Sequence, residues 1–538
     1  MRKYRILEGF VISLLCIMWT VPAFAQVDTA WVRRYNGPEN LGDYASAITV
    51  DDAGNVYVTG GSGTIKYDVN GTQLWVRAWG GSVAAFDTSG NVYLTGVSWG
   101  NRPNFDYTTI KYYPNGDTAW VRRYAAPEDS TDYANSIALD RSGNVYVTGY
   151  SWSSETAFDY ATVKYDPEGN EIWVRRYDGT GNGWDQAWGI VIDGFDNIYV
   201  TGQSSGSETS YDYATIKYYP NGDTAWVRRY NGPADLADGA GPIVVDGSGN
   251  IYVGGYSRDT LTSDDCVTIK YDSSGNEAWV KRYNGPGDFN DGAEAIAVDI
   301  LSNLYVTGTS YGGETGNDYV TIKYDSDGND LWVRRFNGLS NDDDLVNGLE
   351  LDDCGGVYVT GYSKGNLTSF DYATVKYDSS GNELWVQRYN GPGNGWDWAT
   401  DLAISVSGDL YVTGWSLGNS TDYDYATIKY VQEEVFIEVG NQDNIAHSFV
   451  LSQNYPNPFN SRTVIEYTLN SPSDVSLRIY NIKGQLIKTL INAHQEKGLH
   501  SAIWYGKNEK GEKTSSGIYF CQFKAKDYVE TKKMVKLK

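Results

Sequence analysis

The sequence predicts an all-β protein: an eight-bladed β-propeller closed by its N-terminal strand, followed by a small β-sandwich. A tryptophan marker recurs at positions 31, 75, 120, 173, 226, 279, 332 and 385, and the last five intervals are 53 residues each. A fixed period of this size is typical of stacked or radial repeats. After Tyr430 the repeat stops, and a segment with a different pattern runs to the end of the chain.

Each repeat contains four short apolar runs, as in Ala295–Asp299, Leu304–Gly308, Tyr319–Tyr324 and Leu331–Phe336. The runs are rich in Val, Ile, Tyr, Trp and Thr and too short for helices, so we expect strands. Compact D-x-x-G-N segments such as Asp325–Asn329 predict tight hairpin turns, because Gly and Asn tolerate positive φ and Asp caps its own turn. Four antiparallel strands in each of eight repeats predict the blades of a propeller.

The two ends of the repeat region predict closure of the ring. The region begins with an isolated fourth strand, Trp31–Tyr35, and ends with a third strand, Tyr425–Tyr430, that no fourth strand follows. The first strand would therefore complete the last blade, whereas an open array would need capping repeats, and none is visible. Because hairpins alternate in direction, the tight turns should share one face of the ring. The longer and more variable connections should share the other.

One motif of the repeat resembles a known family. The segment D-x-x-G-N-V-Y-V-T-G-Y at Asp140–Tyr150, with the following D-Y-A-T-x-K-Y, resembles the bacterial β-propeller repeat called SBBP, and the resemblance covers residues 31–430. It implies a propeller fold and little about chemistry.

The N-terminus predicts export. Residues 1–25 have a basic start, an apolar centre and Ala23-Phe24-Ala25 before Gln26, which is the pattern of a secretory signal peptide. The apolar part is too short for a spanning helix, and no later run approaches membrane length, so we expect no transmembrane segment in the mature chain. The expected domains are then the propeller (26–431), a polar linker (432–447) and a C-terminal domain (448–538).

The C-terminal domain has the alternating short strands of an immunoglobulin-like β-sandwich, as in Val475–Ile479 and Gly517–Phe523. Its motifs N-Y-P-N-P-F-N (Asn454–Asn460) and S-G-I-Y-F (Ser516–Phe520), with the basic ending K-K-M-V-K-L-K, resemble the C-terminal sorting domain of type IX secretion cargo. The resemblance implies the type IX secretion machinery as a partner, and a secreted or cell-surface location. An accessory immunoglobulin-like domain without a sorting role is the alternative.

The charge and the histidines limit the chemistry. The net formal charge is −25, and because the N- and C-terminal segments are net basic, the excess acid lies in the repeats. We therefore expect no nucleic-acid partner, since phosphates would be repelled. His447, His494 and His500 all lie outside the propeller, which leaves it without a His for general-base work or a zinc site. A non-enzymatic role is favoured.

We expect no cofactor. The acidic segment Asp325–Asp330 has some features of a calcium loop, but it lacks the distal Glu of an EF-hand and aligns with the ordinary turns. The turn interpretation is favoured, and Ca²⁺ binding stays as the alternative.

Two sets of aspartates recur at fixed places in the repeat. One set opens the first strand (Asp43, Asp132, Asp185, Asp238, Asp291, Asp344 and Asp397), and the other precedes the third strand (Asp106, Asp159, Asp212, Asp265, Asp318, Asp371 and Asp424). They could bind cations, or act as the acid and base of a glycosidase. We favour a structural role, in which they cap strands or pair with the Arg-Arg of the fourth strand, because a catalytic centre is singular and these recur in almost every blade.

The tryptophans that differ between repeats are better candidates for function. Trp184 and Trp188 lie in or just after one connection between blades, Trp396 and Trp398 lie in another, and Trp99, Trp152 and Trp415 begin connections between second and third strands. Exposed aromatic faces on loops suit stacking against sugars or anchoring a partner protein. We therefore predict ligand binding by Trp152, Trp184, Trp188, Trp396 and Trp398. The alternative is that these rings pack between loops or against the next blade.

These observations favour an exported binding scaffold for polysaccharide or protein. An extracellular carbohydrate-active enzyme that uses paired Asp residues at the mouth of the ring is the alternative. A purely structural component of the cell surface is a third possibility.

Overall fold

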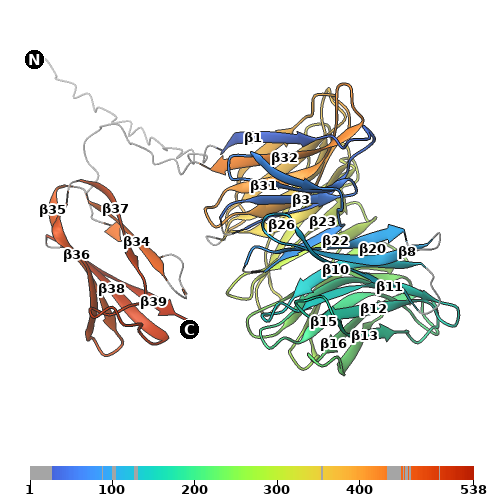
Figure 1. Ribbon diagram of the computed structural model, residues 1–538, viewed down its shortest axis with the longest axis horizontal. Coiled ribbons are helices and arrows are strands. Elements are labelled where there is room, and N and C mark those ends of the chain that lie inside the picture. Colours follow the sequence, from blue (N-terminus) through green and yellow to red (C-terminus); the bar gives the residue numbers. More distant parts are fainter. Residues whose placement is uncertain are drawn as a thin grey trace, which may run out of the picture. The chain divides into compact units, whose positions relative to one another are not determined.

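The structure is a computed structural model that describes residues 27–432 and 450–537, except for 52, 88, 100–103, 127–130, 353–354, 452–453, 455–458, 460–461, 470, 496 and 527. The predicted signal peptide (1–25) and all but the first residue of the predicted linker (432–447) lie outside the described residues. The chain divides into two compact units, residues 1–436 and 437–538, which are described separately (Figure 1). Within the described residues, no helix is long and apolar enough to cross a membrane.

Every regular element in residues 27–432 of the described chain is a strand, and the strands form four-stranded antiparallel sheets. The first four sheets in chain order are β2 (Ala45–Val50), β3 (Val56–Gly60), β4 (Gly63–Tyr67) and β5 (Gln73–Arg77); β6 (Val83–Phe86), β7 (Val92–Trp99), β8 (Phe105–Tyr112) and β9 (Thr118–Tyr124); β10 (Asp132–Leu139), β11 (Val145–Ser153), β12 (Ala157–Tyr165) and β13 (Glu171–Tyr177); and β14 (Asp185–Ile192), β15 (Ile198–Ser205), β16 (Tyr211–Tyr218) and β17 (Thr224–Tyr230).

The following sheets are β18 (Asp238–Val245), β19 (Ile251–Asp259), β20 (Ser263–Tyr271) and β21 (Glu277–Tyr283); β22 (Asp291–Val298), β23 (Leu304–Tyr311), β24 (Asn317–Tyr324) and β25 (Asp330–Phe336); β26 (Asp344–Leu351), β27 (Val357–Lys364), β28 (Phe370–Tyr377) and β29 (Glu383–Tyr389); and β30 (Asp397–Ile404), β31 (Leu410–Leu417) and β32 (Tyr423–Gln432). The last of these sheets takes its fourth strand from the other end of the unit, β1 (Val27–Tyr35).

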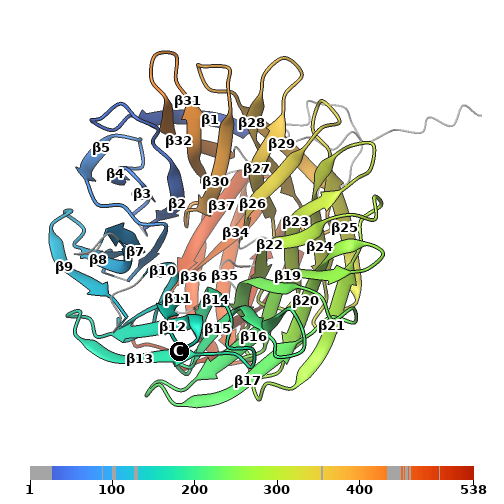
Figure 2. The same cartoon turned by 90° about the vertical axis from the view of Figure 1, so that its right-hand side faces the viewer.

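The sheets have the four-stranded form of propeller blades. The first strands of neighbouring sheets, such as β14 and β18 or β22 and β26, contact one another, and Figure 2 shows the sheets arranged radially with these strands on the inside. The second strands are buried along V-Y-V-T-G, as at β3, because neighbouring sheets cover both faces of each blade. This explains why the apolar runs show little alternation.

Neighbouring sheets are joined by one contact that recurs around the unit. Trp173 of β13 donates its indole N–H to the Pro220 carbonyl oxygen in the turn of the next sheet (3.3 Å), and Arg175 donates to the Gly222 carbonyl oxygen (2.6 Å). The turn glycine must lack a side chain, because a β-carbon at Gly169 would lie 2.7 Å from the Trp120 ring. Gly169 also has φ of +82°, a conformation that glycine adopts without strain. The predicted hairpin turns are confirmed.

The pairing of β1 with β32 reproduces the contacts of the other sheets. Val32 lies opposite Ile428 in an antiparallel register, and the Trp31 indole N–H donates to the Val69 carbonyl oxygen of the β4–β5 turn at 3.2 Å. Arg34 forms an ion pair with Asp424 at 2.9 Å. The N-terminal strand therefore lies in the last sheet and contacts the first one.

The strands differ from the predicted ranges mainly at the first strand of each repeat. From the third sheet onward that strand begins at the aspartate, so β22 starts at Asp291 rather than at Ala295. A register shift between Ala293 and Ala295 interrupts the alternation there, which hides the first half of the strand from a pattern of period two. Two predicted site residues also lie in strands rather than in the expected connections, Trp152 in β11 and Trp398 in β30.

The C-terminal unit contains two sheets. One is β33 (Val450–Leu451), β34 (Thr463–Leu469) and β37 (Gly498–Trp504), and the other is β36 (Leu486–Gln495), β35 (Ser473–Asn481), β38 (Gly517–Ala525) and β39 (Tyr528–Lys536). A single cluster of buried side chains joins the sheets, with Tyr467 and Trp504 from the first and Leu477 and Phe523 from the second. Two sheets around one core make a β-sandwich.

We expect Arg34→Ala to destabilise the repeat unit by about 1–3 kcal/mol, because it leaves the buried Asp424 carboxylate without its cation. Arg229→Ala is the matched control. Arg229 bonds Asp212, Tyr177 and Ser204 as Arg34 bonds Asp424, Tyr389 and Ser416. Thermal unfolding should shift equally in both variants. A loss of stability in Arg229→Ala alone would show that β1 does not occupy the last sheet in solution.

Candidate functional site

Two of the connections between sheets share the sequence G-N-G-W-D, at residues 181–185 and 393–397. Their tryptophans, Trp184 and Trp396, precede β14 and β30, and each residue is 48% exposed. In both loops the aspartate that follows the tryptophan starts the next inner strand and is buried. The loops are therefore fixed at their ends while their indole rings reach solvent.

Trp184 belongs to a group of rings that we call the Trp184 cluster (Tyr150, Trp152, Phe158, Trp184 and Trp188). Phe158 is at its centre, with ring centroids 5.0 Å from Trp152, 5.4 Å from Trp184 and 5.2 Å from Tyr150. Tyr150 extends the cluster to Trp188 of the next sheet at 6.1 Å. The structure thus brings together the predicted residues Trp152, Trp184 and Trp188 across the junction between two sheets.

The second group, the Trp396 cluster, consists of Tyr362, Phe370, Trp396, Trp398 and Trp415. Trp398 contacts Tyr362 at 3.7 Å and stacks on Trp415 at 5.1 Å between ring centroids. Phe370 contacts Trp396 at 5.9 Å and Tyr362 at 5.3 Å. The predicted residues Trp396 and Trp398 are therefore linked through rings of the preceding sheet.

The rings pack against neighbouring loops and blades and also keep exposed area. Trp188 is 42% exposed and Trp184 and Trp396 are 48% exposed, whereas Trp152 and Trp398 have intermediate exposure. Packing fixes the orientation of each ring, and the exposed remainder offers a flat apolar surface beside polar groups.

Sequence reasoning missed the central residues Phe158 and Phe370. Each is followed by an aspartate of the repeated set, in the sequence Phe-Asp-Tyr. Equivalent positions elsewhere carry residues such as Tyr211, Asp264 and Asn317. The sequence did contain a signal for these contacts: in both repeats the Phe precedes the third-strand aspartate and a G-N-G-W-D connection follows the same sheet.

The repeated aspartates have structural partners. Oxygens of the first set accept backbone N–H groups from the preceding connection, which are those of Gly37, Ala126, Gly179, Gly232, Gly285, Gly338 and Gly391. Six members of the second set form ion pairs with an arginine of the fourth strand, namely Asp424–Arg34, Asp159–Arg176, Asp212–Arg229, Asp265–Arg282, Asp318–Arg335 and Asp371–Arg388. These contacts are the strand caps and arginine pairs that the structural interpretation predicted.

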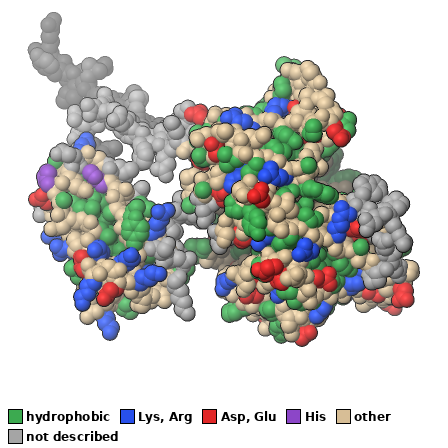
Figure 3. Space-filling view, viewed as in Figure 1, with side chains coloured by type: hydrophobic (Ala, Val, Ile, Leu, Met, Phe, Trp, Pro, Cys, Tyr) green, Lys and Arg blue, Asp and Glu red, His purple; other side chains and the backbone are tan. Residues whose placement is uncertain are grey.

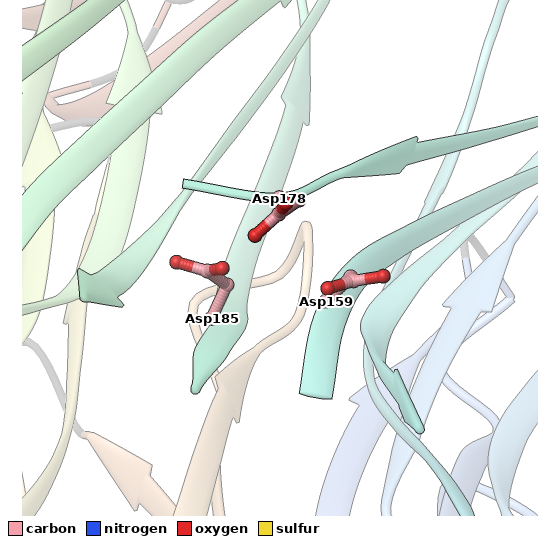
Figure 4. Close-up of side chains that lie close together, drawn as sticks. All are labelled: Asp159, Asp178 and Asp185. Atoms are coloured by element: carbon pink, nitrogen blue, oxygen red, sulfur yellow. The ribbon is translucent and has the colours of Figure 1, made fainter. Parts of the chain in front are cut away.

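One junction adds a third carboxylate. Asp178, in the connection after β13, lies beside Asp159 of β12 and Asp185 of β14, and one oxygen of each lies within 4.8 Å of the others. Figure 4 shows the three carboxyl groups close together on three different segments. Burial raises the pKa of Asp185 to about 6, and the charges of Asp178 and Asp159 act in the same direction. Burial and the charge of Asp159 also raise the pKa of Asp178.

The acidic segment Asp325–Asp330 is an ordinary turn. Asp325 Oδ1 accepts the backbone N–H groups of Asp327 (3.0 Å) and Asn329 (2.8 Å). Asp166 makes the same contact with Asn170 N–H at 2.7 Å. The carboxylate is therefore engaged in capping its own turn, as the turn interpretation predicted.

Family models match both parts of the chain. Residues 30–63 and 119–155 match the model described as Beta-propeller repeat, SBBP. The chain contains SBBP β-propeller repeats. Residues 459–528 match the FlgD Ig-like domain, which agrees with the immunoglobulin-like sandwich expected there.

Individual relatives are distant. A stretch of 341 residues is 24% identical to an uncharacterized WD repeat-containing protein of Acanthamoeba polyphaga mimivirus, and it covers 52% of this chain and 24% of that protein. This chain thus spans about a quarter of that relative. PorZ of Porphyromonas gingivalis, described as a surface component of its type-IX secretion system, is 12% identical with a TM-score of 0.40, over 91% of this chain and 70% of PorZ. The WD40 domain of SCAP from fission yeast is 8% identical with a TM-score of 0.42, over 75% of this chain and 98% of that domain.

We expect the repeat unit to lose stability as pH rises from about 4 to about 7. Burial raises the pKa of Asp132, Asp185 and Asp344 to about 6, so the folded state binds more protons than the unfolded state in that window. Asp344→Asn removes one such group and should unfold at a higher temperature than the wild type at pH 8, with little difference near pH 4.5. Equal unfolding temperatures of the two proteins at pH 8 would contradict the assignment.

Proposed function

We propose that this chain is an exported binding scaffold. A closed, eight-bladed β-propeller binds polysaccharide through the Trp184 and Trp396 clusters, and the C-terminal sandwich directs the chain through type IX secretion. The half-exposed Trp184 and Trp396 rings, each held in a G-N-G-W-D loop, are the observation that carries the binding proposal.

Closure is supported by contacts that cross between the last and the first sheet. Asp401 of β30 accepts the Ile48 backbone N–H of β2 at 2.9 Å, and Thr400 donates to the Ala45 carbonyl oxygen at 3.0 Å. An equivalent contact joins ordinary neighbours, where Asn347 donates to the Ala399 carbonyl oxygen at 2.7 Å. A ring without a free edge holds its loops in a fixed frame, which is the requirement for a preorganised binding surface.

The composition of the Trp184 cluster supports a sugar ligand. Pyranose rings present flat C–H faces that stack on indole, and their hydroxyls need donors and acceptors at the rim. Gln186 and Gln203 supply amides in the strands that follow Trp184 and are hydrogen-bonded to each other at 2.6 Å. A protein ligand would use the same rings as anchors, so the binding test includes it as an outcome.

Burial of the carboxylates favours binding over hydrolysis. A glycosidase needs two carboxyl groups that reach the glycosidic oxygen and the anomeric carbon. Asp185 is 0% exposed and Asp159 is 4% exposed, and Asp159 is paired with Arg176. A sugar would have to displace the loop to reach either one. The carbohydrate-active enzyme is therefore the weaker alternative.

Export is supported by both ends of the sequence. Residues 1–25 have the pattern of a signal peptide, and the C-terminal segment carries the motifs of type IX cargo. The C-terminal unit is a β-sandwich, and Lys and Arg side chains are spread over its visible face in Figure 3. Lys532 and Lys533 lie on the edge strand β39, in the basic ending that the cargo motif includes.

We expect Trp184→Ala and Trp396→Ala each to weaken polysaccharide binding by about tenfold or more, because each removes the exposed face of one cluster. Affinity electrophoresis against a panel of bacterial and plant polysaccharides measures the change. Trp79→Ala is the control, since Trp79 is 46% exposed and belongs to neither cluster.

No retardation of the wild type by any polysaccharide, or equal losses in Trp79→Ala, would contradict the binding proposal. Capture of a defined surface protein that both cluster variants lose would replace the sugar with a protein ligand. Polysaccharide cleavage that Asp185→Asn abolishes would favour the enzyme.

We expect a chain truncated after residue 447 to remain in the periplasm of a bacterium that has the type IX machinery, because the sorting signal is then missing. Immunoblots of periplasm, cell surface and medium measure its location. The full chain in a strain without the machinery should be retained in the same way. Export of the truncated chain would leave the C-terminal sandwich as an accessory domain.

A further inference from the structure

The junction between the sheet of β10–β13 and the sheet of β14–β17 has an unusual first residue in its connection. The residue that follows the last strand residue is Asp178 here, whereas five other junctions have asparagine. Those asparagines donate their side-chain amide to the residue four positions later, in the pairs Asn36–Asn40, Asn231–Asp235, Asn284–Asp288, Asn337–Asn341 and Asn390–Asn394. A carboxylate cannot donate, so Asp178 does not replace that contact.

The substitution changes the charge of the junction. A sister junction such as Asp371–Asp397 has two carboxylates and one guanidinium, that of Arg388. Here Asp159, Asp178 and Asp185 stand against Arg176 alone, which pairs with Asp159 Oδ2 at 2.7 Å. Among the described residues, no ion pair joins Asp178 or Asp185 to a lysine or arginine. The junction is thus left with two negative charges where its sisters have one.

An oxygen at the site also has no partner. Asp159 Oδ2 accepts from Arg176 and from the Thr156 hydroxyl at 2.9 Å. Asp159 Oδ1 is buried and has no hydrogen-bond partner among the described residues, as at the equivalent aspartates of the sister junctions, and only here does a third carboxylate lie beside it. The Asp159 side chain is only 6% exposed. In Figure 4 the carboxyl groups of Asp159, Asp178 and Asp185 lie close together. A buried carboxylate oxygen without a donor is costly, and the adjacent carboxylates repel it further.

The geometry suits a hard cation. One oxygen from each of the three residues lies within 4.8 Å of the others, and two oxygens on opposite sides of Ca²⁺ are about 5 Å apart, since Ca–O distances are about 2.3–2.6 Å. The three residues offer only oxygen, which favours calcium over zinc or copper. Asp178 is exposed, so an ion can enter from solvent and retain water ligands.

We propose that Asp159, Asp178 and Asp185 bind one calcium ion. The ion balances the two excess charges and gives Asp159 Oδ1 a partner. It also joins both ends of the loop that carries Trp184, because Asp178 starts that loop and Asp185 ends it. Calcium binding would therefore hold Trp184 in place. The site does not depend on the binding proposal, since no sugar takes part.

The test uses the mature full-length chain, stripped with EDTA and titrated with CaCl₂ by calorimetry and by thermal unfolding at pH 7.5. We expect one ion per chain, a rise in unfolding temperature, and a dissociation constant in the range of extracellular calcium modules, about 10⁻⁴–10⁻³ M. Asp178→Asn introduces the residue of the sister junctions, so it should fold normally. It should weaken calcium binding at least about tenfold while leaving the EDTA-treated protein at least as stable as the wild type, because it removes one of the three repelling carboxylates.

The twin loop provides a gain-of-function control. Residues 390–397 (NGPGNGWD) differ from residues 178–185 (DGTGNGWD) at only two positions, and Asp371 Oδ1 and Asp397 Oδ1 are both buried without a partner. Asn390→Asp should therefore add a second calcium ion per chain. Absence of binding to the wild type, or unchanged affinity in Asp178→Asn, would overturn the proposal. Equal responses to MgCl₂ and CaCl₂ would show general charge screening instead of a site, and would overturn it as well.

Discussion

The packing of one tryptophan on the turn glycine of the next sheet is the contact on which the repeat unit depends. A β-carbon at Gly381 would lie 2.7 Å from the Trp332 ring, and the backbone there has φ of +81°. The position thus needs glycine for two independent reasons. Because the same contact recurs from sheet to sheet, it sets the distance and angle between neighbours. Trp31 packs on Gly71 in the same manner, so the N-terminal strand joins the last sheet to the first.

Two sets of aspartates hold the variable connections onto the sheets. At seven of the inner strands an aspartate at or just before the strand accepts a backbone N–H from the preceding connection, as Asp397 does from Gly391 at 2.6 Å. The neighbouring aspartate is bound by an arginine of the fourth strand. These contacts fix both ends of a connection and leave its middle free to vary. The loop of Trp396 is one that has gained an aromatic residue, and the loop of Trp184 has gained an aromatic residue and a charge.

The two G-N-G-W-D loops show how an exposed aromatic surface arises from small departures within a repeat. Phe158 and Phe370 support Trp184 and Trp396 from the preceding sheet. The same support is absent where the equivalent residue is Asp264 or Asn317. An exposed indole needs such a neighbour to hold its orientation, because a free side chain would lose rotamer entropy on binding. The two aromatic pairs therefore hold Trp184 and Trp396 in defined orientations.

The sequence by itself determined the blade. Period, turn glycines and apolar runs are local properties, so they predicted the strands, the hairpins and the place of β1 without any contact being known. The sequence-based prediction placed the start of the first strand in each repeat too late. A bulge, such as the one between Ala293 and Ala295, breaks the alternation on which that prediction relied. Only the tertiary structure decided which side chains meet. Asp159, Asp178 and Asp185 do not form a recognisable sequence motif, yet their carboxyl groups lie together. Phe158 likewise contacts Trp184. Both groupings depend on the radial packing of blades, which brings together residues from different strands and connections.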